Sequence, residues 1–283
     1  SQADDAFFAD NMYSNWGEIC ANIKSHVEQY KKAMNIDRAS ATIEDLKALM
    51  QNLPAAKQMS SSVTKHTTVV SHLSKAIKDR RLLDISLLEQ NMASENSANE
   101  HWQRIVDFNE DRSVNRADIA RLALIYNLKY EKAAKGSKAE QLLLGTPYAT
   151  HVANLRAYFG NRNTNATFNS GVMKSVVSYI KGFKDEQNIY TQHEPLLRRT
   201  LVALAQGKLD AEQFPYLAPP TNPNFRPKEV IVCMLGGTTY EEAAMVWKLN
   251  ADPAAANGMK VLLSAPAVHN TRTFLRALNP EME

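Results

Sequence analysis

The sequence has little excess charge of either sign. Among its 283 residues, 33 basic residues stand against 30 acidic ones, which leaves a formal net charge of +3. The closest approach to a basic run, Lys78-Asp79-Arg80-Arg81, is interrupted by an acid and is typical of a solvated helix end. Because nucleic-acid binding by bulk charge needs dense clusters of lysine and arginine, the composition argues against that class of protein.

Cysteines and long apolar stretches are also scarce. The two cysteines, Cys20 and Cys233, have no second Cys or His at metal-ligand spacing. Each lies in an apolar run, so we expect two small buried hydrophobes in a reducing compartment. No apolar stretch approaches the ~20 residues that a membrane span needs, and the acidic start, residues 1–5, is no signal peptide. If this protein works at membranes, something other than its own sequence must therefore bring it there.

Hydrophobic residues, in contrast, recur at helical spacing through the first two thirds of the chain. Steps of three or four residues predict one long helix with an apolar stripe. The members of this stripe are Met12, Trp16, Ile19, Ile23, Val27, Tyr30 and Met34.

The next segment, residues 42–79, predicts a helical hairpin. A helix over 42–53 precedes Pro54, where we expect the chain to kink or turn, and a second helix follows over 55–79. The second helix has a heptad seam, the pattern of helices that pack lengthwise on other helices. On spacing alone, a hairpin packed wholly within its own domain is favoured over a docking role. The seam comprises Met59, Val63, His66, Val70, Leu73 and Ile77.

Capping residues predict the helices that follow. Asp84 is expected to cap a helix over 85–95, and Asn115 to cap a long one. Thr146-Pro147 is expected to open a helix that Gly160 closes. A polar loop is predicted over 161–171, and a last helix over 195–206 ends before Gly207.

Beyond residue 217 the pattern changes. Four prolines within residues 217–227 exclude a helix, so we predict a domain boundary there. Buried strands are expected over 230–235 and 260–264, the first buried on both faces, with helices over 239–249 and 271–278. This βαβα unit has only two strands, which form no stable sheet alone. We therefore expect the chain to be a fragment whose remaining strands come from elsewhere.

Candidate catalytic or ligand-binding residues are few. Gly236-Gly237-Thr238-Thr239 occupies the place where phosphates bind in nucleotide-binding folds, but without their GxGxxG or GxxxxGK[ST] spacing. A tight turn with Thr238 or Thr239 as helix cap is favoured. His193, Glu194 and His269 are expected to be caps or hydrogen-bond partners, since no nucleophile or carboxylate pair accompanies them. His66, in the seam, is expected to be a partly buried packing residue. No metal motif is present in the sequence.

Several motifs resemble the Sec/Munc (SM) family of SNARE-binding proteins. The run Arg226-Pro-Lys-Glu-Val-Ile-Val-Cys-Met-Leu-Gly-Gly-Thr-Thr-Tyr-Glu-Glu-Ala243 is similar to that family's final βαβ segment. Other similar stretches follow in the family's order through nearly the whole chain, and the forms at 190–193 and 236–242 resemble its endosomal/trans-Golgi branch. These stretches are residues 4–13, 59–73, 88–90, 190–193, 214–217 and 268–271.

The resemblance implies a mostly α fold. Residues 1–217 match the family's helical third domain with a protruding hairpin, and residues 218–283 match the second half of its discontinuous α/β second domain. No part of the chain matches the first domain, which holds the syntaxin N-terminal peptide in the family. The resemblance therefore also implies that this chain lacks high-affinity syntaxin binding.

It further implies a non-enzymatic protein without cofactors that promotes SNARE assembly in vesicle-mediated transport and membrane fusion. The implied partners are a Qa-SNARE of the endosome/trans-Golgi route, vesicle SNARE helices and the N-terminal part of the same SM protein, with no nucleic acid and no membrane insertion. The implied location is cytoplasmic, with recruitment to endosome and Golgi membranes through SNAREs. The implied SNARE-binding residues of the hairpin are Pro54, Ala56, Met59, Ser60, Val63, Thr67, Val70 and Ser71.

Two other functions stay open at this point. A helical scaffold or tethering subunit would bind helical-repeat partners instead of SNARE motifs. A nucleotide-dependent α/β enzyme using residues 236–239 would be stabilised by nucleotides in a thermal-shift screen, because a ligand that binds only the folded state raises its stability.

Overall fold

The fold is described by a computed structural model. It describes residues 5–34, 43–132, 135–159, 193–218, 226–252 and 254–281, with the backbone alone for residues 33–34, 43–56 and 159. By contacts the chain divides into two units, Ser1–Arg80 and Arg81–Glu283. Each unit is described by itself below.

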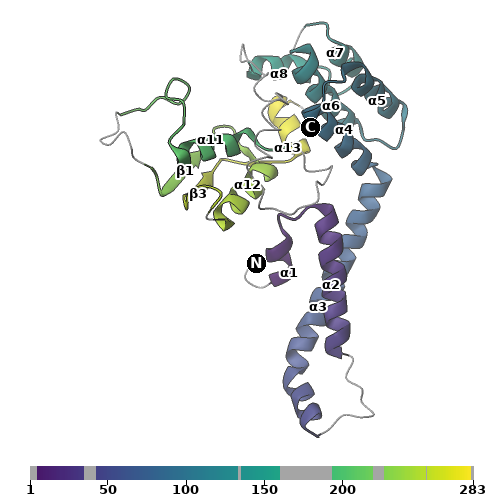
Figure 1. Cartoon of the computed structure of the whole chain (residues 1–283). Coiled ribbons are helices and arrows are strands. Elements are labelled where there is room, and N and C mark those ends of the chain that lie inside the picture. Colours follow the sequence, from purple (N-terminus) through teal and green to yellow (C-terminus); the bar gives the residue numbers. More distant parts are fainter. Residues whose placement is uncertain are drawn as a thin grey trace. The chain divides into compact units, whose positions relative to one another are not determined.

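Three helices make up the described part of the first unit. The short α1 (Ala6–Asn11) precedes α2 (Trp16–Met34) and α3 (Ile43–Asp79), which lie side by side along their lengths (Figure 1). Two hydrogen bonds set their antiparallel register: the Tyr30 hydroxyl donates to Ser60 Oγ at 3.2 Å, and His26 Nε2 lies 3.3 Å from Ser62 Oγ. The long helix predicted from the first apolar stripe is confirmed from Trp16 onward.

The predicted turn at Pro54 is wrong, and the alternative, a kink within the helix, stays a prediction. Helix α3 is continuous over 37 residues, and the hairpin is made by α2 and α3 instead of by two halves of α3. A proline removes one hydrogen bond and costs about 3 kcal/mol inside a helix, but tertiary context routinely overrides such local penalties. In a helix this long, one missing bond is a small fraction of the ladder, and α2 supports its later turns.

The second unit begins with a helical region of six elements. Two apolar clusters hold them together: one joins α4, α5 and α6, and the other joins α6, α7, α8 and α13. The elements are α4 (Leu82–Ser94), α5 (Ala98–Glu110), α6 (Arg116–Tyr126), a π-helix (Asn127–Glu131), α7 (Lys138–Leu143) and α8 (His151–Phe159).

Two predicted helix starts in this region need correction, and a third is confirmed. Asn115 caps α6, since its side chain accepts a hydrogen bond from the Ala117 amide at 2.9 Å. Asp84 is not a cap, because its carboxylate pairs with Arg81 and α4 already begins at Leu82. Thr146 accepts the Tyr148 amide in a turn, and α8 begins only at His151. Gly160 and the predicted loop over 161–171 lie outside the described residues.

The α/β part matches the predicted order of elements. Strands β1 (Glu229–Cys233) and β3 (Lys260–Ser264) pair in parallel, and α11 (Leu196–Gln206), ended by Gly207 at φ 65°, packs on them with α12 (Tyr240–Ala251). A second short parallel pair, β2 (Thr238–Thr239) with β4 (Val268–His269), was not predicted from the sequence. The last helix, α13 (Thr271–Leu278), begins at the predicted residue.

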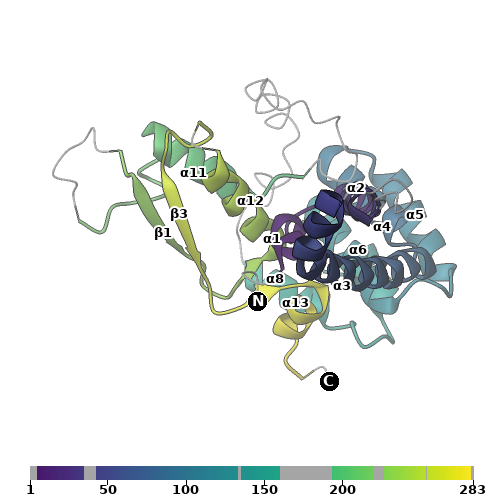
Figure 2. The same cartoon turned by 90° about the horizontal axis from the view of Figure 1, so that it is seen from below.

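The prediction that the first strand is buried on both faces is wrong. The cross-strand pair Ile231 and Leu262 is 69% and 61% exposed, whereas Val261 is 5% exposed. Helices α11 and α12 cover one face of the β1–β3 pair, as Figure 2 shows. Cys233 is exposed instead of buried because alternate residues of a strand share a face and it shares that of Ile231.

Two helices pack across the predicted domain boundary at residue 217. On its N-terminal side, Leu201 and Ala205 of α11 belong to the core of the α/β part. On its C-terminal side, Leu275 and Leu278 of α13 belong to the core of the helical region. The boundary itself stays a prediction. No helix among the described residues is long and apolar enough to cross a membrane.

Candidate functional site

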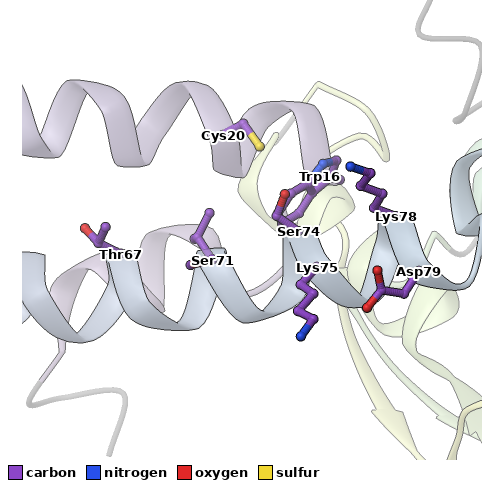
Figure 3. A pocket seen from close by; sticks show the side chains of 9 residues that line it. Trp16, Cys20, Thr67, Ser71, Ser74, Lys75, Lys78 and Asp79 are labelled. Carbon is purple, nitrogen blue, oxygen red and sulfur yellow. The ribbon is translucent and has the colours of Figure 1, made fainter.

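A groove runs along one side of the α2–α3 pair. It consists of two adjoining cavities of about 570 Å³ and 350 Å³, both lined by Thr67 and Val70. Figure 3 shows the larger cavity, with Ser71 and Ser74 of α3 pointing toward Trp16 and Cys20 of α2. A third helix packing against a helix pair requires such a furrow.

The groove arises from the size and spacing of the residues on the two helices. On α2, Trp16, Cys20, Ile23 and Val27 step by four, three and four, so they form one stripe along the groove. Opposite them, α3 presents the small side chains of Thr67, Ser71 and Ser74. Small residues facing a stripe of larger ones leave space between the helices. The lining extends from Trp16 to Lys31 on α2, about 22 Å at 1.5 Å per residue.

The rim of the groove is mainly basic. Four lysines line it, two on each helix, against two carboxylates. Lys78 extends toward Trp16 across the end of the groove (Figure 3). Exposed charges of this kind contribute more to the choice and approach of a partner than to affinity, and salt screens them. The six rim residues are Lys24, Glu28, Lys31, Lys75, Lys78 and Asp79.

The structure gathers some of the predicted SNARE-binding residues in this groove. Thr67, Val70 and Ser71 line it. Met59, Ser60 and Val63 are half-buried farther toward the N-terminus of α3. Pro54 and Ala56 belong to α3, but their side chains lie outside the described part. Whether any of these residues contacts a SNARE stays a prediction.

Sequence reasoning missed the α2 half of the groove. Trp16, Ile23 and Val27 were recognised only as the apolar stripe of a long helix, and Cys20 only as a buried hydrophobe. Their heptad-like spacing matched that of the α3 seam, and this match was the available signal. His66 is 9% exposed, which confirms the prediction of a packing residue.

Helix α1 supports the pair through Asp5 and Phe7. The Asp5 carboxylate forms an ion pair with Lys65 and lies 2.9 and 3.0 Å from His66 Nε2. The hydrogen bond from Lys65 is the main cause that holds the pKa of Asp5 well below its usual value, against the opposing effect of burial. The Phe7 ring lies between His26 of α2 and His66 of α3, with centroid distances of 4.8 and 4.6 Å.

The glycine-rich turn in the second unit is a helix cap, as predicted. Thr239 and Glu242 form a capping box at the start of α12: the Thr239 hydroxyl accepts the Glu242 amide, and the Glu242 carboxylate accepts the Thr239 amide at 2.8 Å. The same carboxylate accepts a hydrogen bond from Thr238. The His269 side chain contacts the same turn, with its Nε2 atom 2.9 Å from the carbonyl oxygen of Gly236. A carboxylate therefore already occupies the position that a phosphate would take.

The histidine–glutamate pair before α11 also makes local contacts. The His193 amide donates to Gln90 Oε1 at 2.8 Å, and burial lowers the pKa of the His193 side chain. Glu194 forms an ion pair with Arg198 one turn later at 3.0 Å. Glu194 thus acts as an ion-pair partner, as expected from the sequence, whereas the hydrogen bond of His193 is made by its backbone and the role of its side chain stays a prediction.

The fold and the groove together define a mostly helical chain in which an antiparallel helix pair accompanies a partial parallel α/β unit. The chain belongs to the Sec1 family, whose family model matches residues 1–277. Human vacuolar protein sorting-associated protein 45 is 36% identical over 97% of this chain, and its Arabidopsis thaliana homolog is 31% identical over 98%. The chain spans about half the length of these relatives, 49% in both cases. The family resemblance seen in the motifs is thereby confirmed.

Solved structures agree with this assignment. A structure described as the SM protein Vps45 in complex with the Qa SNARE Tlg2 superposes with a TM-score of 0.81 at 30% identity, covering 100% of this chain and 51% of that one. The Unc18–syntaxin 1 complex from Monosiga brevicollis superposes with a TM-score of 0.68 at 17% identity, over 97% of this chain and 50% of that one. The second likeness shows the fold alone. The predicted fold class, mostly α with a helical hairpin and a partial parallel α/β unit, is confirmed.

Proposed function

We propose that this chain is the part of an SM protein that binds SNARE helices and regulates their assembly in vesicle-mediated transport and membrane fusion. The groove between α2 and α3 is the observation that carries the proposal. Support also comes from a structural relative that is described as an SM protein bound to the Qa SNARE Tlg2. The names of the curated relatives support a role in vacuolar protein sorting. The motifs at 190–193 and 236–242, which resemble the endosomal/trans-Golgi branch, support a route through those compartments.

The proposed mechanism is template binding. Disordered segments lose conformational entropy when they fold on a partner, and the first helical turn is the costly one. A preformed groove removes part of that cost by holding an amphipathic helix through its apolar stripe. A groove of about 22 Å takes about fifteen residues of helix, or two heptads. The lysine-rich rim favours a helix with acidic residues beside its apolar stripe.

The protein is proposed to act by binding instead of catalysis. We further propose a cytoplasmic location, with recruitment to endosome and Golgi membranes through the bound SNAREs. The N-terminal part of the same SM protein is a proposed partner of the α/β part, where Ile231 and Leu262 form an open apolar face. Two strands alone make a marginal sheet, so added strands would stabilise it.

Calorimetry with isolated SNARE motifs tests the proposal. We expect weak binding by the whole chain, and at least a tenfold loss for Val70→Asp, because the new carboxylate would lie under the apolar stripe of the bound helix and would neutralise part of the lysine-rich rim. Val69→Asp is the matched control, since Val69 is 48% exposed and does not line either cavity. Circular dichroism melting verifies that both variants fold. A Pro54→Ala variant tests whether α3 also contributes beyond the groove.

Two outcomes would contradict the proposal. One is no binding of any SNARE motif at high micromolar concentration. The other is an equal loss of affinity for Val69→Asp and Val70→Asp, which would place the contact on another face of α3. Binding to helical-repeat partners in the absence of SNARE binding would favour the scaffold alternative.

A further inference from the structure

Helix α1 contacts both helices that form the groove. It contacts α3 through Asp5, which pairs with Lys65 and His66, and through the Phe7 ring against His66. It contacts α2 through Phe7 against His26 and through a 2.7 Å hydrogen bond from Asn22 to Asn11. The six-residue α1, with its N-cap Asp5, thus makes one polar contact and one ring contact with each of α2 and α3, and these contacts anchor it to both helices.

Local hydrogen bonds fix the shape of α1 itself. The Asp5 carboxylate also accepts the Phe8 amide at 3.0 Å, so the residue that ties α1 to α3 is also its N-terminal cap. The Asn11 side chain donates to the Phe7 carbonyl at 2.8 Å. The backbone around Phe7 is therefore held by Asp5 on its N-terminal side and by Asn11 on its C-terminal side.

These contacts lie on the side of the helix pair away from the groove. At about 100° per residue, Asn22 and His26 project roughly 110° from the mean direction of the α2 groove stripe. On α3, Lys65 and His66 project roughly 140°, in the same sense, from the mean direction of Thr67, Val70, Ser71 and Ser74. Because α2 and α3 run antiparallel, rotations of more than 90° in the same sense place the α1 contacts of both helices on one side of the pair. The inter-helix seam lies between that side and the groove.

We propose that α1 is a clamp that sets the separation of α2 and α3 and thereby the width of the groove, with Asp5 and Phe7 as positioning residues. At the groove, the small side chains of α3 leave space in front of the larger stripe of α2, so the distance between the helices is not fixed by close packing there. The Phe7 ring acts as a spacer on the opposite side, and Asp5 keeps it in place. The proposal concerns the regulation of the SNARE-binding site and rests on that proposed function.

The first test needs no partner. With 5-fluorotryptophan incorporated, the ¹⁹F resonance of Trp16, assigned by Trp16→Phe, reports on the groove. We expect Asp5→Asn and Phe7→Ala to shift or broaden it. Asp10→Asn is the control, because Asp10 is exposed on the same helix. Asp5→Glu, which keeps the charge, is expected to restore the wild-type signal at least in part.

The second test uses a SNARE motif as the probe. We expect Asp5→Asn to weaken its binding by about fivefold, and Asp10→Asn to leave it unchanged. Coupling between sites is reciprocal, so binding of the motif must slow hydrogen exchange of the α1 amides even though α1 lies outside the groove. If Asp5 served fold stability alone, Asp5→Asn would lower the melting temperature, but binding of the SNARE motif to the wild-type chain would not slow hydrogen exchange in α1.

The outcomes separate the two proposals. If Asp5→Asn moves the Trp16 resonance but the wild-type chain binds no SNARE motif, the clamp stands and the SNARE proposal is overturned. The opposite result is also possible: the wild-type chain binds the SNARE motif, but Asp5→Asn and Phe7→Ala have the same affinity and the same Trp16 resonance as the control Asp10→Asn. In that case the clamp is overturned and the SNARE proposal stands.

Discussion

Arg121 joins three helices of the second unit. Its guanidinium forms an ion pair with Glu89 of α4, donates to Asp118 of α6 at 2.9 Å, and donates to Thr271 of α13 at 2.8 Å. Burial raises the pKa of Glu89, and the guanidinium of Arg121 opposes this shift. The side chain of Asp118 is 1% exposed, so its charge depends on protein partners instead of water.

Replacing Arg121 should therefore be costly. We expect Arg121→Met to lower the free energy of unfolding by about 3 kcal/mol, because the loss of one member of a buried ion pair leaves the other charge uncompensated. Urea unfolding followed by circular dichroism measures the change. Arg116→Met is the control: Arg116 is exposed on the same helix and bonds to Asn109, so its loss should cost no more than about 0.5 kcal/mol. Equal costs for the two variants would show that the network around Arg121 contributes no special stability.

At the scale of single elements, the sequence predicted what depends on neighbouring residues. Caps at Asn115 and Thr239, the end of α11 at Gly207 and the bounds of β3 and α13 follow from short-range hydrogen bonds and φ preferences. The predicted turn at Pro54 failed because a local penalty was weighed without the length and support of α3. Its partner α2 directly precedes it along the chain, and the heptad-like spacing that the two helices share was not used to pair them.

The candidate site was predictable only in part for the same reason. Thr67, Val70 and Ser71 were selected through the resemblance to SM proteins and do line the groove. The α2 residues were missed because a groove belongs to two helices at once. Its depth depends on which small side chains meet which larger ones, and this requires the antiparallel register set by contacts such as Tyr30 to Ser60.

The two faces of the β1–β3 pair should respond differently to substitution. We expect Val261→Ala to cost about 2 kcal/mol, since it removes two buried methyl groups and leaves a cavity under α12. Ile231→Ala should cost less than about 1 kcal/mol, because that side chain is 69% exposed. Thermal unfolding of this chain measures both. A cost for Ile231→Ala as large as that for Val261→Ala would mean that the second face is also covered in solution.

At the scale of the whole molecule, the α/β part and the helical region of the second unit depend on each other. Helix α11 precedes the proline-rich segment yet completes the core on β1 and β3, and α13 follows the strands yet packs between α6 and α8. The Asn154 side chain donates to the Leu278 carbonyl at 2.8 Å, which fixes the end of α13. Cutting the chain at residue 217 would therefore expose apolar surface on both products.

The open sheet face leads to a prediction about association. Ile231 and Leu262 lie side by side and exposed, and within the described residues the sheet has only two strands with both outer edges unpaired, a combination that promotes association with other chains. We expect the isolated chain to self-associate as its concentration rises, and an Ile231→Lys, Leu262→Lys variant to remain monomeric. Sedimentation equilibrium over a concentration series measures this. Phe8→Lys is the control, since Phe8 is 48% exposed in the other unit. A wild-type chain that stays monomeric, or a Phe8→Lys variant that loses association equally, would show that this face is not the site of self-association.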